Sequence, residues 1–546
     1  MAHESSSQDS RSIASLLDDA VHQENPSLAL TILNRTILAS AEPEDLDPLS
    51  TISTVLTSGK EGAEDVLRTI GSRCSPREAI LAIQEEAEKL YHRLESEEVK
   101  DGLDGDGEDS AVSISPATQV ARLLMLYELA LPRLAKRKKS SAAILSPLIS
   151  QIARLIDQLR RTTPKQSARI IIPSVASMIQ VLRLWIDEER YEGSSSADML
   201  YDLARNTVEI FPNAATEGLL EQSFSRNFPR LVVPARRGEA SDRPESVAMN
   251  LLMDAIAAIG IKDSQEISRP SIASIVLLAR RPGYVMDIPT LKAFSNVLIF
   301  CIQTNTAIEG TLSILLDTLA KLKSLDPPPE LPEEVLVPLV HSLAPLASVH
   351  PDPSVRHSTF RILALALALA PSIWRLSLLT ELVSEDEESM PQMRVAAVGL
   401  VKEAVLEALQ TAPGSSAAQS NVFVSPLFMR QLGSQLFLHL PESISTTVRL
   451  KKFLESAEPS RLVEVLGLLF VLLKRDVDNR TGIADYSLLR QIVRQVLQPL
   501  QSRLQEWKIE MDADPGLQYA RFRVEIVEMW VERVFSAIQD IIPDNI

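Results

Sequence analysis

The sequence predicts an all-α protein whose helices form antiparallel pairs. Apolar residues recur at helical spacing from the first elements onward, as at Ile13, Leu16, Leu17 and Ala20. Period-2 alternation, which a half-buried strand requires, is rare. Glycine is scarce as well, with 18 among 546 residues, and this disfavours β-rich and dinucleotide-binding folds that need many tight turns. A helical array is therefore the expected architecture.

Breaks in the helical pattern divide the chain into four expected regions. Residues 1–96 form an N-terminal helical region, and residues 97–117 form an acidic disordered linker. Residues 118–323 contain the middle helical repeats. Residues 324–546 contain the C-terminal HEAT-like repeats and begin with a stiff proline-rich connector. Shorter loops are expected at 192–197, 235–247 and 411–422.

Residues 332–410 show the clearest repeat. Two helix pairs are expected there, and the second helix of each pair begins with similar residues, Val355-Arg356 and Met393-Arg394, which lie 38 residues apart. Either Asp352 or Ser354 can cap the free backbone N–H groups at the start of the first of these helices. The pattern is typical of HEAT and armadillo repeats, so the predicted fold is a HEAT/armadillo-like helical-repeat solenoid of antiparallel helix pairs.

Arg356 and Arg394 are the first candidate functional residues, since an arginine at this position could bind a partner. We expect a structural role instead, in which each arginine stabilises the stacking of the helix pairs. It would do so by hydrogen bonding across the turn to an acidic neighbour, which for Arg356 is Asp352.

Charge and apolar patterning disfavour several classes of function. The chain carries 55 Lys+Arg against 72 Asp+Glu, a net charge of -17, with 4% aromatic residues, so it lacks the basic field and stacking side chains of a nucleic-acid binder. Its longest apolar runs have nine residues, too few to span a bilayer. The polar N-terminus resembles no secretory signal, and two cysteines are too few for a disulfide framework. We expect a monomer in the cytoplasm, with the nucleus as a second compartment, that binds neither nucleic acid nor membrane.

The sequence contains no recognisable enzyme motif. It has no phosphate-binding loop, no nucleophile elbow, no H-E-x-x-H and no C-x-x-C pair. His350 and His357 flank a turn, but no third ligand follows at the spacing of a metal site. We therefore expect a non-enzymatic protein with no catalytic residues, no metal and no cofactor.

A partner surface is expected in the last third of the chain, where basic residues are dense in an otherwise acidic protein. Arginine and tryptophan are enriched at interface hot spots. The candidate partner-binding residues are Lys474, Arg475, Arg490, Arg494, Arg503 and Trp507. For Trp507 the alternative is equally open, namely that it closes the core of the final repeat together with Trp530.

Two other features have both a functional and a structural interpretation. The run from Arg133 to Lys139 is either a charged helix end that complements the helix dipole or a site for nuclear import or for an acidic partner. Cys74 lies beside Arg73 and before a predicted helix start at Pro76. Because that setting can lower a thiol pKa, Cys74 is a candidate redox thiol, with an inert surface thiol as the alternative.

Three segments carry a resemblance to a known family. They are His350-Pro-Asp-Pro-Ser-Val-Arg-His-Ser-Thr-Phe-Arg-Ile-Leu363, Met393-Arg-Val-Ala-Ala-Val-Gly-Leu-Val-Lys402 and Val422-Phe-Val-Ser-Pro-Leu-Phe428. These segments resemble the glomulin / YAP-binding protein family, whose members include a plant lateral-root-formation protein and fungal stress and kinetochore proteins. The resemblance covers about residues 332–500, and the chain looks like a fungal member.

The resemblance implies a HEAT-like solenoid without enzymatic activity. Through glomulin it implies that C-terminal repeats bind the RING-box subunit of cullin-RING ubiquitin ligases and cover the surface where the ubiquitin-conjugating enzyme docks. The expected function is therefore a regulatory protein that blocks or scaffolds ubiquitin transfer. Through the fungal branch the resemblance implies, as an alternative, association with an AP-1-like stress transcription factor in peroxide signalling or with kinetochore components. No contact residue is carried over from the family, because the C-terminal region has no motif sharp enough.

Overall fold

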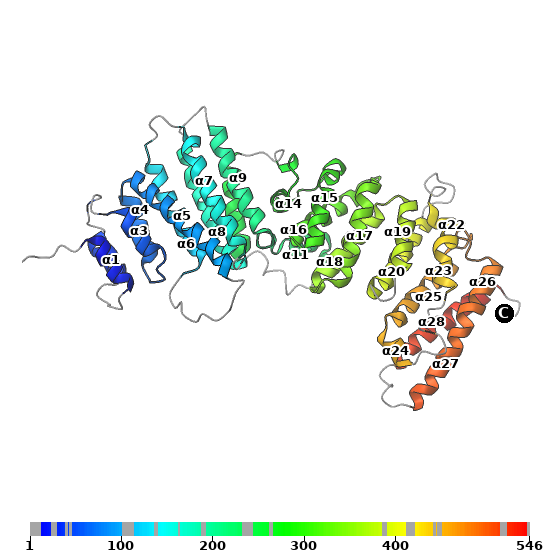
Figure 1. Ribbon diagram of the computed structural model, residues 1–546. Helices are drawn as coiled ribbons and strands as arrows, with labels where there is room; N and C mark the ends of the chain where they lie inside the picture. The colour runs from blue at the N-terminus through cyan, green and yellow to red at the C-terminus, as the bar shows by residue number, and fades with distance from the viewer. Residues whose placement is uncertain are drawn as a thin grey trace, which may run out of the picture. The chain divides into compact units, whose positions relative to one another are not determined.

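Two compact units, each built from packed helices, make up the computed structural model of the chain (Figure 1). Unit 1 contains Met1–Tyr284 and Thr304–Ile314, and unit 2 contains Val285–Gln303 and Leu315–Ile546. The structure describes residues 12–542 except 23–29, 39–41, 43–45, 101–113, 136–139, 162–163, 187–192, 232–243, 261–265, 385–389, 411–420, 440–443, 445–449 and 514–520. These described residues contain no β-strand, which confirms the all-α prediction.

Unit 1 is a stack of helices in two layers. Its main helices are α1 (Ile13–His22), α3 (Pro48–Leu56), α4 (Ala63–Arg73), α5 (Pro76–Lys100), α6 (Pro116–Ala130), η3 (Leu131–Arg133), α7 (Ser141–Gln158), α8 (Pro164–Ile186), α9 (Gly193–Ile210), α10 (Pro212–Thr216), α11 (Leu219–Asn227), α12 (Pro244–Ile259) and α14 (Ile272–Ala279). In one layer α3 packs against α5, α5 against α7 and α7 against α9. In the other layer α4 packs against α6 and α6 against α8. Each helix thus contacts the next but one along the chain, which is the packing of a helical-repeat solenoid.

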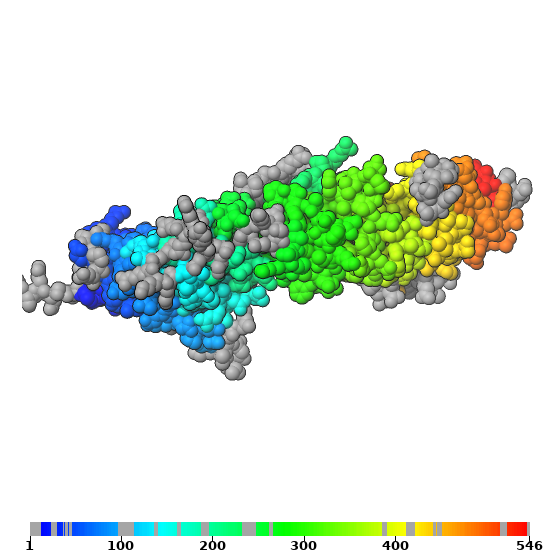
Figure 2. Space-filling model, turned by 90° about the horizontal axis from the view of Figure 1, so that it is seen from above, coloured from blue at the N-terminus to red at the C-terminus, as the bar shows by residue number. Residues whose placement is uncertain are grey.

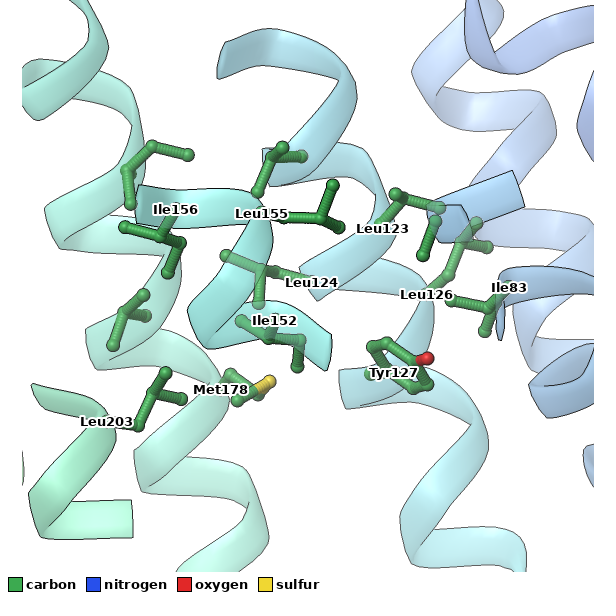
Figure 3. Packing of buried hydrophobic residues seen from close by; sticks show 14 of the residues in the cluster. Ile83, Leu123, Leu124, Leu126, Tyr127, Ile152, Leu155, Ile156, Met178 and Leu203 are labelled. Carbon is green, nitrogen blue, oxygen red and sulfur yellow. The ribbon is translucent and has the colours of Figure 1, made fainter. Parts of the chain in front are cut away.

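The core of unit 1 lies between these two layers. In α6, Leu124 and Tyr127 are fully buried, and they lie among apolar side chains from α5, α7 and α8 (Figure 3). The neighbours drawn there include Ile83, Ile152, Leu155 and Met178. Because α6 contacts helices of both layers, its apolar stripe is wide, and the buried surface is shared by successive helices rather than closed within one pair.

Unit 2 continues the same kind of packing. Its helices are α15 (Ile288–Thr304), α16 (Ile308–Lys323), α17 (Glu333–Val349), α18 (Pro353–Ala368), α19 (Ser372–Ser384), α20 (Pro391–Gln410), η7 (Val422–Val424), α22 (Pro426–Phe428), η8 (Met429–Gly433), α23 (Ser434–Phe437), α24 (Leu450–Glu455), α25 (Glu458–Arg475), α26 (Tyr486–Ile492), η10 (Val493–Leu497), α27 (Gln498–Ala513) and α28 (Arg521–Gln539). Thr304 and the start of α16 up to Ile314 belong to unit 1. The strongest contacts join α17 with α18, α19 with α20, α20 with α25 and α25 with α28.

The predicted repeat at 332–410 is confirmed as two helix pairs, α17 with α18 and α19 with α20. Asp352 is the N-cap of α18, and its Oδ1 accepts a hydrogen bond from the Ser354 backbone N–H at 2.8 Å. Pro353 occupies the first helical position, where its missing N–H costs nothing. The helical-repeat solenoid predicted from the sequence is therefore the observed fold.

Some expected loops are helical in the structure. Gly193 to Ala197, placed in a loop by their serine content, form the first turn of α9, and residues 244–247 form the first turn of α12. The physical reason is that serine and proline suit the start of a helix, because that turn leaves backbone N–H groups without intrahelical acceptors. The loop predicted at 411–422 lies mostly outside the described residues. The acidic linker does as well, since α5 extends to Lys100 and α6 begins at Pro116.

Helix α8 has the length and apolar composition to cross a membrane over Lys165–Ile186, and it is the one such helix in the described part of the chain. It packs against α6, α9 and α12, and Ile171, Val175 and Met178 are buried in these contacts. Packing in the centre of a helical stack accounts for its apolar sequence.

Candidate protein-binding site

The segment α26–η10–α27 is one continuous helical stretch from Tyr486 to Ala513. Its inward stripe is apolar and buried, and consists of Leu489, Ile492, Val493, Val496, Leu497, Leu500, Leu504 and Trp507. The π-helical stretch η10 interrupts the α-helical hydrogen bonding in the middle, a feature that is frequent at functional sites. Because the inward stripe anchors the segment in unit 2, the opposite face is left at the surface. The orange part of the space-filling view in Figure 2 includes residues of this segment.

Asp485 fixes the start of this segment as its N-cap. Its Oδ1 accepts hydrogen bonds from the Ser487 hydroxyl at 2.7 Å and from the Ser487 backbone N–H at 2.8 Å. These two hydrogen bonds lower the pKa of Asp485 below its ordinary value, so its carboxylate is charged at neutral pH. A charged cap suits the positive end of the helix dipole and determines the register of the residues that follow.

The outward face of the segment is polar and lacks carboxylates from residue 490 to residue 505. Its exposed side chains, which we call the Arg-Gln face, are Arg490, Gln491, Arg494, Gln495, Gln498, Gln501, Ser502 and Gln505. Gln491 donates a hydrogen bond to Gln495 at 3.2 Å. Within the described part of the chain, neither Arg490 nor Arg494 forms an ion pair. The face therefore presents two free guanidinium groups one turn apart, with amide groups around them.

The other basic candidates are partly engaged within the chain. Lys474, at the end of α25, forms an ion pair with Asp540 at 2.8 Å. Arg503 forms an ion pair with Glu506 at 2.5 Å, and its guanidinium lies 5.1 Å from the centre of the Trp507 ring. Only 13% of the Arg503 side chain is exposed. Arg475 is exposed beside Lys474. The structure thus brings Arg490 and Arg494 together on one surface and gives Arg503 a packing role.

Trp507 lies in the core, where its ring stacks on Phe453 with 4.4 Å between the ring centres. A fully buried indole cannot form part of a surface that a partner contacts. The interpretation of Trp507 as a core residue therefore describes its position, and its prediction as a partner-binding surface residue is wrong. Trp530 is partly buried and meets Phe470 edge to face at 5.9 Å, so it also contributes to packing.

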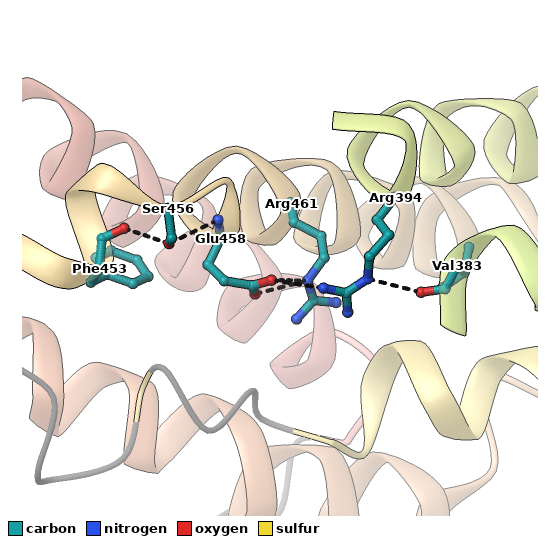
Figure 4. A network of polar contacts seen from close by, with 6 residues as sticks. All are labelled: Val383, Arg394, Phe453, Ser456, Glu458 and Arg461. Atoms are coloured by element: carbon teal, nitrogen blue, oxygen red, sulfur yellow. Dashed lines mark hydrogen bonds and ion pairs between the residues drawn. The ribbon is translucent and has the colours of Figure 1, made fainter. Parts of the chain in front are cut away.

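Arg394 joins three helices in the interior of unit 2 (Figure 4). Its Nε donates to the Val383 carbonyl in α19 at 3.2 Å, and its Nη1 lies 3.4 Å from Oε1 of Glu458 in α25. Glu458 also accepts from Arg461 Nε at 2.8 Å. All three charged side chains are largely buried. This position agrees with the structural role expected for Arg394.

Arg356 stabilises its turn through the backbone rather than through Asp352. Its Nη1 donates to the carbonyl oxygens of His350 at 2.5 Å and Pro351 at 3.1 Å. The Asp352 carboxylate is instead occupied by the backbone N–H and the hydroxyl of Ser354. The structural role expected for Arg356 is thus present, but the carboxylate partner predicted for it is wrong, because capping α18 uses that carboxylate.

Cys74 is fully buried at the end of α4, so it is not the surface thiol that either interpretation assumed. Its Sγ lies 3.0 Å from the Leu46 carbonyl oxygen, to which the thiol donates. Burial raises the pKa of Cys74 to about 12, and the nearby Arg133 guanidinium offsets this effect only in part. Because the thiolate is the reactive form, this environment disfavours a redox role.

Exposed apolar residues beside the Arg-Gln face were missed by the sequence analysis. Tyr486 lies at the start of the segment and Ile509 near its end, and Phe522 follows at the start of α28. All three are more than half exposed. The signal for Ile509 was present in the sequence, since it falls outside the inward stripe of Leu500, Leu504 and Trp507. Exposed apolar side chains next to free arginines are typical of a surface that a partner covers.

Fold and surface together define a class of protein, namely a helical-repeat solenoid that offers extended surfaces for binding other proteins. In the described ranges, no group of three or more His, Cys, Asp or Glu side chains is arranged to hold a metal ion. The model of an uncharacterised protein family described as YAP/Alf4/glomulin matches residues 275–529. The matched stretch is similar to that family, contains the candidate surface and extends beyond the residues that carry the resemblance in the sequence. No curated protein matches the sequence.

Similarity to this family supports a regulatory role that is exercised through protein–protein interaction. The matched residues contain every helix from α15 to α27 and α28 up to Met529. The Arg-Gln face therefore lies within the part of the chain that the family shares.

Proposed function

We propose that the protein is a non-enzymatic regulator that binds the RING-box subunit of a cullin-RING ubiquitin ligase through the Arg-Gln face. The observation that supports this proposal is the pair of exposed, unpaired guanidinium groups of Arg490 and Arg494 in the family-matched region. The partner itself is the one that the resemblance to glomulin implies. Binding would block or scaffold ubiquitin transfer.

The mechanism we propose is steric competition. A stable complex needs about 800 Å² of buried surface on each partner. A helical segment of 28 residues from Tyr486 to Ala513, flanked by exposed apolar side chains, supplies a surface on this scale. Because the segment is anchored by a continuous buried stripe, its outward face is rigid, and little order has to be gained on binding. A partner held there cannot offer the same surface to a ubiquitin-conjugating enzyme.

The proposal includes the cellular setting and the state of the protein. We place it in the cytoplasm, with the nucleus as a second compartment, and we propose that it acts as a monomer without a cofactor. These statements rest on the sequence, in which we find no enzyme motif and only two cysteines.

The test reverses the charge of the two free arginines in the full-length chain. Arg490→Glu combined with Arg494→Glu should weaken binding to a purified RING-box–cullin complex at least tenfold. The change replaces two positively charged hydrogen-bond donors with carboxylates, which carry the same sign of charge as the protein as a whole. The matched control is Arg430→Glu with Lys451→Glu, which changes two exposed basic residues of unit 2 outside the face. Affinity is measured by calorimetry, and inhibition is measured by ubiquitin transfer.

The outcomes separate the partner from the surface. If the wild-type chain binds and inhibits, but both double variants behave alike, the RING-box partner is right and the Arg-Gln face is wrong. If the wild-type chain does not bind, the RING-box partner is wrong. Weight then moves to the AP-1-like stress transcription factor or to kinetochore components, where the same two double variants test the same face.

A further inference from the structure

A polar hollow lies on the surface of unit 1, where α6 is flanked by α4 and α8. Its volume is about 380 Å³. The lining residues are Thr118, Ala121, Arg122, Met125 and Glu128 of α6, Glu64 and Arg68 of α4, and Ile170, Pro173, Ser174 and Ser177 of α8. All of them are described residues, and all lie outside the stretch from 275 to 529 that the family model matches. The hollow is therefore a feature of unit 1 alone.

The hollow extends along α6. Thr118 and Glu128 are the first and last lining residues of this helix, and they lie about 15 Å apart along the helix axis. The short side chains of Thr118 and Ala121 leave space above α6. The wall on the α8 side is one face of that helix, since its residues follow the spacing i, i+3, i+4 and i+7. An extended polypeptide advances about 3.3 Å per residue, so about five residues of a bound chain would occupy the length of the hollow.

The two arginines that line the hollow are engaged within unit 1. Arg68 forms an ion pair with Glu64, in which Nη2 lies 2.7 Å from Oε1. Arg122 donates from Nη1 to the carbonyl oxygens of Leu56 at 3.0 Å and Ser58 at 2.8 Å. These carbonyl groups lie at the C-terminal end of α3 and in the turn after it, where intrahelical donors are lacking. Both guanidinium groups therefore have structural partners, and neither forms an ion pair with the acidic residue at the other end of the hollow.

That acidic residue is Glu128, which is partly buried. The Ser177 hydroxyl lies 3.0 Å from each of its two carboxylate oxygens. A hydroxyl supplies one proton, whereas an ionised carboxylate offers about four acceptor positions. Within the described part of the chain, Glu128 forms no ion pair. Arg122 lies six residues earlier on α6, about 9 Å away along the helix axis. The hollow thus contains a carboxylate with unused acceptor positions and without a basic partner among the described residues.

A cationic group on an aliphatic stem fits this arrangement. The Glu128 carboxylate can accept charge-assisted hydrogen bonds, which are stronger than hydrogen bonds between neutral groups. Met125, Ile170 and Pro173 add apolar surface to the hollow, and the methylene stems of lysine and arginine pack along such surface while their charged heads reach a polar partner. The chain has a net charge of -17, so its long-range field attracts basic partners to a site of this kind.

We propose that the α4–α6–α8 hollow binds a lysine or arginine side chain of a partner protein, with the extended chain of the partner lying along α6. Glu128 accepts hydrogen bonds from the cationic head, and Met125, Ile170 and Pro173 contact the stem. The hollow uses no residue of the Arg-Gln face and lies in unit 1, so this inference is independent of the function proposed for unit 2.

The experiment selects random 12-residue peptides from a display library against the full-length protein and measures their affinity by fluorescence polarisation. The expected peptides contain lysine or arginine. Glu128→Gln keeps the size of the side chain and an acceptor for the Ser177 hydroxyl but removes the charge, so it should weaken peptide binding at least tenfold. Raising the salt concentration from 50 to 500 mM should weaken binding as well, because salt screens the ionic contact.

The matched control is Asp202→Asn, which removes an exposed carboxylate of α9 in the other layer of unit 1 and should leave peptide binding unchanged. Ala121→Trp fills the hollow without changing its charge and should also weaken binding at least tenfold. The proposal is overturned if no peptide is selected, if the selected peptides lack lysine and arginine, or if Glu128→Gln weakens their binding no more than Asp202→Asn does. Spermine that binds the wild-type chain but not Glu128→Gln, when no peptide does so, would assign the hollow to a small polyamine and would equally overturn it.

Discussion

Glu458 is a buried carboxylate between the guanidinium groups of Arg394 and Arg461. Two positive charges close together in the interior of a protein are tolerated only when an anion compensates them. The free energy of this cluster depends on Glu458 more than on either arginine, because losing Glu458 breaks two ion pairs, whereas losing one arginine breaks one.

Glu458→Gln should therefore destabilise unit 2 by about 3 kcal/mol, because it removes the carboxylate that contacts two buried guanidinium groups. The measurement is urea unfolding followed by tryptophan fluorescence, since Trp374, Trp507 and Trp530 all lie in unit 2. Glu455→Gln, at an exposed position on α24, is the matched control and should change stability by less than about 0.5 kcal/mol. Equal effects of the two variants would show that the cluster does not stabilise the fold.

Cys74 should be inert in the folded protein. Burial removes its Sγ from solvent and raises its pKa to about 12, so the thiolate is a minor species at neutral pH. In a Cys301→Ala variant, which leaves Cys74 as the one thiol, labelling by an aromatic disulfide at pH 7.5 should be at least 100-fold slower than in 6 M guanidinium chloride. Rapid labelling of the native variant would restore the redox hypothesis.

At the scale of the element, the start of α18 depends on its N-cap. Burial acts to raise the pKa of Asp352, but hydrogen bonds from the Ser354 hydroxyl and backbone N–H outweigh it, and the net shift is downward from 3.8. A depressed folded-state pKa means that the charged cap stabilises the fold above pH 3.8. That contribution disappears as the pH falls through the lower pKa of the folded state.

Asp352→Ala should reduce the stability of unit 2 by about 1 kcal/mol at pH 7, the usual cost of losing an N-cap. The difference from the wild-type protein should shrink below pH 3.8, because the wild-type carboxyl group becomes protonated. Asp352→Asn keeps a side-chain acceptor at the cap and should cost only a few tenths of a kcal/mol at pH 7. Urea midpoints at pH 7 and pH 3.5 measure both effects, and a pH-independent difference for Asp352→Ala would contradict the role of the charge.

At the scale of the whole molecule, the Arg-Gln face lies in unit 2. It combines two exposed guanidinium groups with neighbouring exposed apolar side chains in a chain whose net charge is -17. A local basic site on an acidic protein favours acidic partners at that site, while the remaining surface repels them.

The all-α class and the repeat at 332–410 could be predicted from the sequence, because helical periodicity and caps are local signals. The sequence placed the start of α18 near Pro353 with Asp352 or Ser354 as its cap, and the structure identifies Asp352 as the N-cap. The prediction of a loop at 192–197 was wrong for Gly193 to Ala197, which begin α9. Serine residues favour both loops and helix starts, so this local signal is ambiguous.

The candidate site was predicted only in part. The density of arginines pointed to residues 474–503, but composition cannot show which side of a helix faces the core. Arg490 and Arg494 face outward because Leu489, Ile492 and Val493 are drawn into unit 2, and that choice is made by the neighbouring helices.

The sequence by itself determined the helices, their pairing and the family match over residues 275–529, since these depend on residues that are close along the chain. Only the tertiary structure decided that Cys74 and Trp507 are buried and that Leu81 remains exposed. Cys74 and Trp507 are buried because residues distant in the chain, such as Leu46 and Phe453, pack against them. At these positions burial depends on long-range packing, which the local sequence pattern does not report.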